Sequence, residues 1–298
     1  MINEYGFLRH MNTFAEENSI KSVEKISDNK LKIVAEDGLT YALALYDIDN
    51  HTSIENEKNI RQRLEIIGLK PLEIYEEGIL PDIKKSYKIF EYRKEISLGE
   101  FLDKSDSETS FKVGENFGKI LKDIHESKPI EPIDWEKEFL TKSNYLFYIH
   151  GLSEDIGESD YILIDYIDAN IHLTKNTPIN LIYGKISEKN IRVYDDSKLD
   201  LRALKDISFG DGVFDFVDVN KLAIKYPEFS KGVLKGYFGG GKPTRKFFRL
   251  LSIYQAYILL YNKVDKNIEK EHHLEDDEIN AIMQMYDSFN QLVPTWAK

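Results

Sequence analysis

Two short segments of this chain carry side chains that could bind a cation or move a proton. In residues 204–216 a strand-like stretch ends on Asp206 and is followed by a Gly-Asp turn and a helix that opens with another carboxylate. Upstream, residues 183–191 read Tyr-Gly-Lys-Ile-Ser-Glu-Lys-Asn-Ile and carry Lys185 and Asn190. Carboxylate and carboxamide oxygens are ligands that magnesium prefers, and a carboxylate can also accept a proton from a hydroxyl group.

Together the two segments resemble the active-site segments of the aminoglycoside phosphotransferase and choline kinase family, relatives of the protein kinases. In that family the first segment reads H-G-D-x-x-x-x-N, and the second reads I-D followed by G-D-x-x-x-D-L. The resemblance implies that ATP and Mg²⁺ are the cofactors, with Asn190 and Asp206 as the metal ligands. It implies structural roles for Asp211 and for Asp215, the latter as a cap or loop anchor.

The chain departs from the family pattern at two positions that matter for phosphoryl transfer. The catalytic aspartate of the family falls on Lys185, and an ammonium group cannot accept a proton from a substrate hydroxyl. The phosphate-binding lysine falls on Ala44, while its partner carboxylate is kept at Glu57. Two interpretations of Lys185 stay open: it binds nucleotide phosphates in place of the lost cation, or it forms a salt bridge with Asp206 in an empty site.

Lys32, on the preceding strand, is a candidate replacement for the cation missing at Ala44. Asp37-Gly38 is a strong hairpin signal, because both positions tolerate a positive φ. With a two-residue turn, Lys32 pairs with Leu43 and points away from the face that carries Ala44. A one-residue bulge would reverse this result. The simple register therefore predicts that Lys32 does not replace the lost lysine.

Other parts of the family pattern extend the resemblance over nearly the whole chain. Phe90, Glu91 and Tyr92 resemble the hinge that offers backbone groups to adenine. The stretch Phe117 to His125 resembles a family helix that ends in histidine, which predicts a structural role for His125. We expect Tyr183, in place of the family histidine, to keep a packing role.

The periodicity of apolar residues predicts a small α+β N-lobe over residues 1–92 and a larger, mostly helical C-lobe over residues 93–298. This is the bilobal, protein-kinase-like α+β fold of the family. The expected N-lobe strands span 22–27, 30–35, 40–46, 72–75 and 86–92, with helices over 5–16 and 54–67. The clearest helices expected in the C-lobe span 111–127, 247–264 and 275–292.

Composition limits the classes of partner and compartment. The net charge of −12 over 298 residues disfavours nucleic acid and suits cationic ligands. No apolar run is long enough to span a membrane and no secretory signal opens the chain, so we expect a cytoplasmic protein. The absence of cysteine excludes disulfides and thiolate chemistry.

Two further patterns favour structural interpretations. Residues 236–243 nearly match a phosphate-binding loop, but Pro243 replaces the required hydroxyl residue, so we expect a turn between helices. His272 and His273 stand among acidic residues, and we expect them at a solvated helix start. The acidic residues 275–278 are a minor candidate for binding a cationic substrate.

These departures favour a pseudokinase that acts by binding a nucleotide, a small molecule or a protein partner. The favoured small molecule is cationic. The alternative is an active ATP-dependent small-molecule kinase that has rebuilt its site around Lys185, Asn190 and Asp206.

Overall fold

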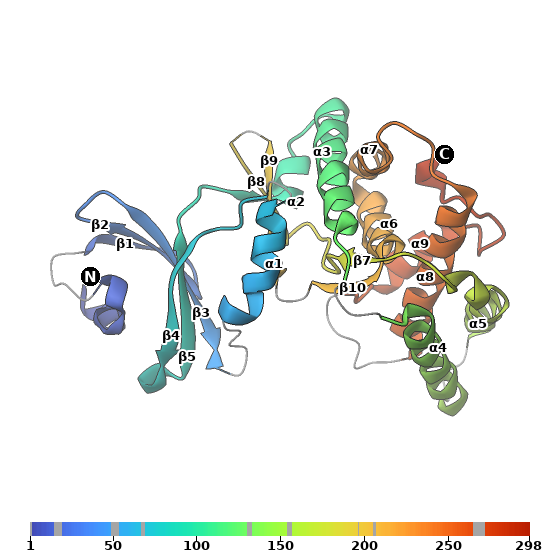
Figure 1. Ribbon diagram of the computed structural model, residues 1–298, viewed down its shortest axis with the longest axis horizontal. Coiled ribbons are helices and arrows are strands. Elements are labelled where there is room, and N and C mark those ends of the chain that lie inside the picture. Colours follow the sequence, from blue (N-terminus) through green and yellow to red (C-terminus); the bar gives the residue numbers. More distant parts are fainter. Residues whose placement is uncertain are drawn as a thin grey trace. The chain divides into compact units, whose positions relative to one another are not determined.

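The computed structural model divides the chain into two compact units, Met1–Glu95 with Tyr194–Asp196, and Ile96–Val193 with Ser197–Lys298 (Figure 1). It describes residues 2–14, 20–48, 54–66, 69–129, 133–153, 157–195, 197–204, 207–264 and 272–298, with the backbone alone at 2–4 and 54–59. Within the described residues, no helix is both long and apolar enough to cross a bilayer.

The first unit is built on an antiparallel five-stranded sheet in the order β1-β2-β3-β5-β4 (Figure 1). Its strands are β1 (Ile20–Ser27), β2 (Lys30–Ala35), β3 (Thr40–Asp47), β4 (Ile74–Leu80) and β5 (Lys85–Glu91). One helix, α1 (Ile54–Ile66), connects β3 to β4 along the chain. Four of the five expected strands and this helix are confirmed to within about two residues at each end.

The leading segment is not the single amphipathic helix expected over 5–16. It forms two 3₁₀ helices, η1 (Ile2–His10) and η2 (Asn12–Phe14). Leu8, Met11 and Phe14 are all buried in the core on one face of the sheet. Their spacing of three residues matches the three residues per turn of a 3₁₀ helix, which explains why the tighter helix is adopted.

The strand expected at 72–75 is longer and lies later in the sequence. β4 begins at Ile74, shifts register between Ile74 and Glu76, and continues to Leu80. The Glu76 carboxylate accepts hydrogen bonds from the backbone N–H of Thr13 (2.6 Å) and from the Tyr87 hydroxyl (2.6 Å). These hydrogen bonds fix the leading segment to the sheet. The sequence does not predict a strand here because glutamate has a low strand propensity.

The β2–β3 hairpin corrects the register expected for Lys32. The N–H of residue 35 donates to the carbonyl of residue 39, so the loop has three residues and ends on Gly38 at a φ of 87°. This is the common three-residue hairpin in which a left-handed glycine forms the bulge. Lys32 therefore lies opposite Ala42, not Leu43, and on the same face as Ala44.

The second unit is mostly helical. Its helices are α2 (Leu98–Leu102), α3 (Ser107–Glu126), α4 (Trp135–Leu152), α5 (Glu158–Asn170), α6 (Phe216–Lys225), α7 (Pro227–Tyr237), α8 (Arg245–Val264) and α9 (Asp276–Met285). The helix expected over 275–292 ends early, because residues 287–289 adopt left-handed backbone conformations. The phosphate-loop-like stretch is confirmed as the turn between α7 and α8, with Gly239 and Gly240 at positive φ.

Two small sheets complete the second unit and frame its functional segments. β7 (Ile179–Ile182) pairs with β10 (Ser208–Asp211), and β8 (Ile191–Tyr194) lies between β6 (Ile96–Ser97) and β9 (Lys198–Leu201). Residues 183–190 thus form the loop that leaves one small sheet and enters the other.

Helices α3 and α7 pack against each other through glycines. A side chain at Gly114 or Gly118 of α3 would collide with the backbone of α7, and one at Gly232 or Gly236 would collide with the backbone of α3. This spacing of four residues on each helix permits close approach of the two backbones. The contact fixes α3, whose last turn carries His125.

We predict that Glu76→Gln lowers the thermal stability of the protein and makes that stability less sensitive to acid. Burial alone would raise the pKa of the Glu76 carboxyl, but hydrogen bonds from Thr13, Tyr87 and Asn12 lower it below its ordinary value of 4.5. A lowered folded-state pKa adds stability above the ordinary value, and this is lost as pH falls through the folded value. The wild type should therefore lose more of its thermal midpoint than the variant between about pH 5 and pH 3.

Circular dichroism melts at several pH values measure this difference. Glu36→Gln, at an exposed turn position, is the matched control and should behave as the wild type. Equal acid sensitivity of Glu76→Gln and the wild type would contradict the assigned role.

Candidate ligand-binding site

The loop over residues 183–190 is held in place by one buried carboxylate, that of Asp215. Its two oxygens accept hydrogen bonds from the backbone N–H groups of Tyr183 (2.8 Å) and Gly184 (2.7 Å). Gly184 has a φ of 69°, a conformation that a residue with a side chain rarely adopts. The expectation that Asp215 anchors a loop is confirmed.

His125 completes this anchor. Its Nε2 lies 3.0 Å from the second oxygen of Asp215, and its Nδ1 lies 2.8 Å from the Tyr237 hydroxyl. The imidazole is almost fully buried, so it links the end of α3 to the loop and to α7. The structural role expected for His125 is confirmed.

Tyr183 and Asn190 fix the two ends of the loop relative to each other. The buried Tyr183 hydroxyl lies within hydrogen-bond distance of the carbonyls of Arg202 (2.7 Å) and Asn190 (3.1 Å). The carboxamide nitrogen of Asn190 donates to the carbonyl of Lys185 at 3.1 Å. This leaves the amide oxygen of Asn190 as the atom that could bind a cation.

Asp218, on α6, connects the loop to a histidine from the far end of the chain. One of its oxygens accepts from the backbone N–H of Ile186 at 3.1 Å, and the other lies 3.4 Å from Nδ1 of His272. That distance is an ion-pair contact, longer than a good hydrogen bond. Burial alone would lower the pKa of His272, but Asp218 raises it above its ordinary value of 6.5.

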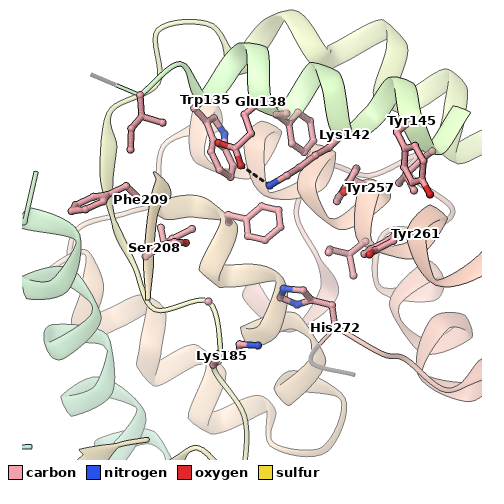
Figure 2. A pocket seen from close by; sticks show the side chains of 17 residues that line it. Trp135, Glu138, Lys142, Tyr145, Lys185, Ser208, Phe209, Tyr257, Tyr261 and His272 are labelled. Carbon is pink, nitrogen blue, oxygen red and sulfur yellow. Dashed lines mark hydrogen bonds and ion pairs between the residues drawn. The ribbon is translucent and has the colours of Figure 1, made fainter. Parts of the chain in front are cut away.

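The loop and His272 border a cavity of about 580 Å³ in the second unit. This volume falls within the range of small-molecule sites in proteins. Figure 2 shows Lys185 and His272 on one side and Trp135 and Lys142 of α4 on the opposite side. Six of the other residues that line it are aromatic: Phe139, Tyr145, Phe209, Phe214, Tyr257 and Tyr261.

Two of the three basic groups in the described lining face a carboxylate: His272 faces Asp218 and Lys142 faces Glu138. Among the described residues, Glu138 is the carboxylate of the wall, and it lies 2.6 Å from the ammonium of Lys142 on the next turn of α4 (Figure 2). Lys185 and His272 add two basic groups. The described wall therefore offers flat apolar surfaces and basic groups, and its carboxylate already faces a lysine.

A buried hydrogen-bond chain holds the indole of Trp135 in the cavity wall. Its N–H donates to the Tyr254 hydroxyl at 2.9 Å, which in turn donates to Asp211 at 2.8 Å. Asp211 also accepts from the backbone N–H of Val213 at 3.0 Å, so it caps the 3₁₀ turn η7 (Gly212–Asp215). The structural role expected for Asp211 is confirmed, and it extends to the cavity.

Of the residues expected at the site, the structure describes Lys185 and Asn190 in the second unit. Lys185 lies in the cavity wall, and Asn190 lies at the other end of the same loop. Asp206 lies outside the described residues, so its role as a metal ligand stays a prediction, as does its pairing with Lys185. Glu57 lies on α1, and its side chain is also outside the described part.

In the first unit, Ala44 occupies the middle of the central strand β3, with Lys30 and Lys88 opposite it. Phe90 and Glu91 end β5, and the N–H of Tyr92 donates to the carbonyl of residue 40 at 3.2 Å. The contribution of these hinge residues to adenine binding stays a prediction.

Sequence reasoning missed His272 and the aromatic wall. His273 is exposed, as expected for a solvated helix start, but the side chain of His272 is only 19% exposed. The acidic residues next to it in sequence suggested exposure to solvent, whereas its partner is Asp218, on α6. The spacing of Trp135 and Phe139 by four residues, after the helix cap Asp134, was a usable signal for one face of α4.

No protein-family model matches this sequence, and neither does any curated protein sequence. Solved structures do match in fold. The choline/ethanolamine kinase family protein from Mesorhizobium loti is similar over 98% of both chains, with a TM-score of 0.61 and 12% identity. A thermostable mutant of aminoglycoside phosphotransferase APH(4)-Ia, in a ternary complex with ADP and hygromycin B, has a TM-score of 0.63 and 11% identity over 86% of this chain and 88% of that one.

The chain has the kinase-like fold of the aminoglycoside phosphotransferases and choline kinases. Amicoumacin kinase hAmiN, solved with AMP-PNP, Ca²⁺ and Ami, is also similar, with a TM-score of 0.53 and 12% identity over 94% of this chain and 91% of that one. The family-like fold and the α+β class expected from the sequence are thereby confirmed.

We predict that Asp215→Asn lowers the free energy of unfolding of this kinase-like protein by about 3 kcal/mol. The NH₂ group of the asparagine would replace one acceptor oxygen and face a backbone N–H donor. Chemical unfolding followed by tryptophan fluorescence measures the loss. Asp168→Asn, an exposed change on α5, is the matched control and should be neutral. Equal stability of the two variants would show that the loop does not depend on this carboxylate.

Proposed function

We propose that this protein is a pseudokinase: it binds a nucleotide and a small molecule without transferring phosphate between them. The observation that carries the proposal is the ammonium group of Lys185 in the cavity wall, at the loop position where the family has a carboxylate. Phosphoryl transfer to a hydroxyl needs a group that orients the hydroxyl and accepts its proton. A lysine ammonium has donors only and cannot do this.

The chemistry of the cavity wall supports a planar or aromatic ligand. Aromatic faces give large apolar contact areas and stack well on flat molecules. The expected preference for a cationic ligand stays a prediction: among the described residues of the wall, Lys142 faces Glu138 and His272 faces Asp218. We propose a ligand with an aromatic body and an anionic group, because Lys142, Lys185 and His272 can each donate a hydrogen bond to an anion.

Nucleotide binding is supported by the fold and by the nature of its neighbours, one of which was solved with ADP and another with AMP-PNP. For Mg²⁺, the amide oxygen of Asn190 fits as a ligand, because the amide nitrogen is already held by the loop. Asp206 is the second proposed ligand. Bound Mg²⁺ would neutralise phosphate charge and orient the phosphates.

The cavity can be tested through its own tryptophan. The chain has two tryptophans, and Trp296 is buried elsewhere against Asn220. In a Trp296→Phe variant, Trp135 is therefore the sole indole and reports on the cavity. We predict that phenyl phosphate quenches or shifts its fluorescence at lower concentration than phenyltrimethylammonium, an aromatic probe of opposite charge.

The same samples, incubated with Mg-ATP, should show a raised thermal midpoint and no release of ADP above a protein-free control. The panel for turnover includes choline, aminoglycosides and sugars. ADP release that depends on any of these acceptors would rule out the pseudokinase assignment. Fluorescence that responds to neither aromatic probe would rule out the aromatic ligand class.

One observation favours a second candidate, an active phosphotransferase: the His272–Asp218 pair borders the same cavity as Lys185. A neutral imidazole oriented by a carboxylate is a common general base. It would accept the proton of the acceptor hydroxyl while the hydroxyl oxygen bonds to the terminal phosphorus of ATP and ADP leaves with the electrons of the broken P–O bond.

This candidate predicts a specific pH profile. Since Asp218 raises the pKa of His272, the protonated form persists above pH 6.5 and activity should rise as pH increases through the raised value. His272→Gln should abolish the acceptor-dependent ADP release, whereas His273→Gln, its exposed neighbour, should leave it unchanged. Equal activity of both variants would exclude His272 as the base.

A further inference from the structure

The register of the first sheet brings two lysines to either side of the position where the family's lysine is missing. Lys30 of β2 lies directly opposite Ala44 of β3, and Lys88 of β5 lies directly opposite it on the other side. The three residues form one row across neighbouring strands. Directly opposed residues have Cβ atoms about 5 Å apart, so the two lysine stems start about 10 Å apart with one methyl group between them.

This row belongs to the face of the sheet that does not carry the apolar core. The residues that alternate with the row, such as Leu31 and Leu43, are the ones buried in that core with η1 and η2. On the face of the row, β3 contributes only small side chains near its centre, Ala42 and Ala44. Two flexible lysine stems can therefore reach over the same spot.

Lys30, Lys88 and their neighbour Lys32, which lies on the same face, each have an acidic residue nearby, as the phosphate-binding lysine of the family does. Lys32 is 2.9 Å from Glu24 on β1 and lies over the Tyr92 ring, so its position is set by these contacts. Lys30 has a longer contact, 3.8 Å to Glu95. Lys88 is only 6% exposed and lies directly opposite Glu77 of β4, and a lysine so deep in a protein is almost always paired.

We propose that Lys30 and Lys88 together supply the cation lost at Ala44 and bind the phosphates of a nucleoside triphosphate. The inference rests on the nucleotide binding proposed above. Moving the charge to neighbouring strands keeps it over the same point of the sheet. Strand β5 also ends on the hinge residues Phe90 and Glu91, so one strand would carry both a phosphate contact and the expected adenine contact.

Calorimetric titration of the full chain with Mg-ATP and, separately, with adenosine tests this assignment. We predict that Lys30→Met and Lys88→Met each weaken Mg-ATP binding about tenfold and leave adenosine binding unchanged, because adenosine has no phosphates. Lys85→Met is the matched control: Lys85 is on the same strand, points to the other face and contacts Asp47 at 2.6 Å. It should bind both ligands as the wild type does.

Two measures keep the test informative if the buried Lys88→Met variant does not fold. Lys88→Arg preserves the charge and should retain most of the affinity for Mg-ATP, and Lys30 is partly exposed, so its replacement leaves no buried hole. If the wild type binds Mg-ATP and both methionine variants bind it equally well, the relocated cation is refuted while nucleotide binding stands. If the wild type binds neither Mg-ATP nor adenosine, the proposed nucleotide binding itself fails.

Discussion

The second unit depends on the way the Asp215 carboxylate is surrounded. Two backbone N–H groups and the imidazole of His125 converge on its two oxygens, away from water. Hydrogen bonds to a buried charge are strong, and leaving such a charge without partners would cost several kcal/mol. This one group therefore ties helix α3, the loop over residues 183–190 and the start of α6 into a single arrangement.

The nature of that arrangement explains why Lys185 is tolerated. The loop is held through backbone N–H groups at positions 183, 184 and 186, and through the left-handed conformation of Gly184. None of these contacts uses the side chain at position 185. The frame can therefore persist when the side chain that performs chemistry changes from an acid to an amine. Retention of the fold and retention of the activity are physically separate at this position.

Local sequence signals predicted most elements of this structure, and long-range contacts account for most of the differences. The strands at 30–35 and 40–46 and the helix ending at Val264 follow from alternation and helical periodicity. The three-residue loop at Gly38 was not predicted, because an Asp-Gly pair is compatible with two hairpin registers that differ by one residue. Since side chains alternate, that single residue decided which face carries Lys32.

In the candidate site, too, local patterns predicted the roles of some residues and missed contacts between residues far apart in sequence. The roles of Asp215, Asp211 and His125 were predictable because the family pattern fixes their spacing within short segments. The position of His272 was not, because its partner Asp218 is far from it in sequence and the contact exists only after α6 and α9 have packed. Local acidic neighbours suggested solvent, yet burial next to a distant carboxylate gives His272 a raised pKa and a place in the cavity wall. A pattern of charges along the chain thus predicts an ion pair only when both partners lie on the same element.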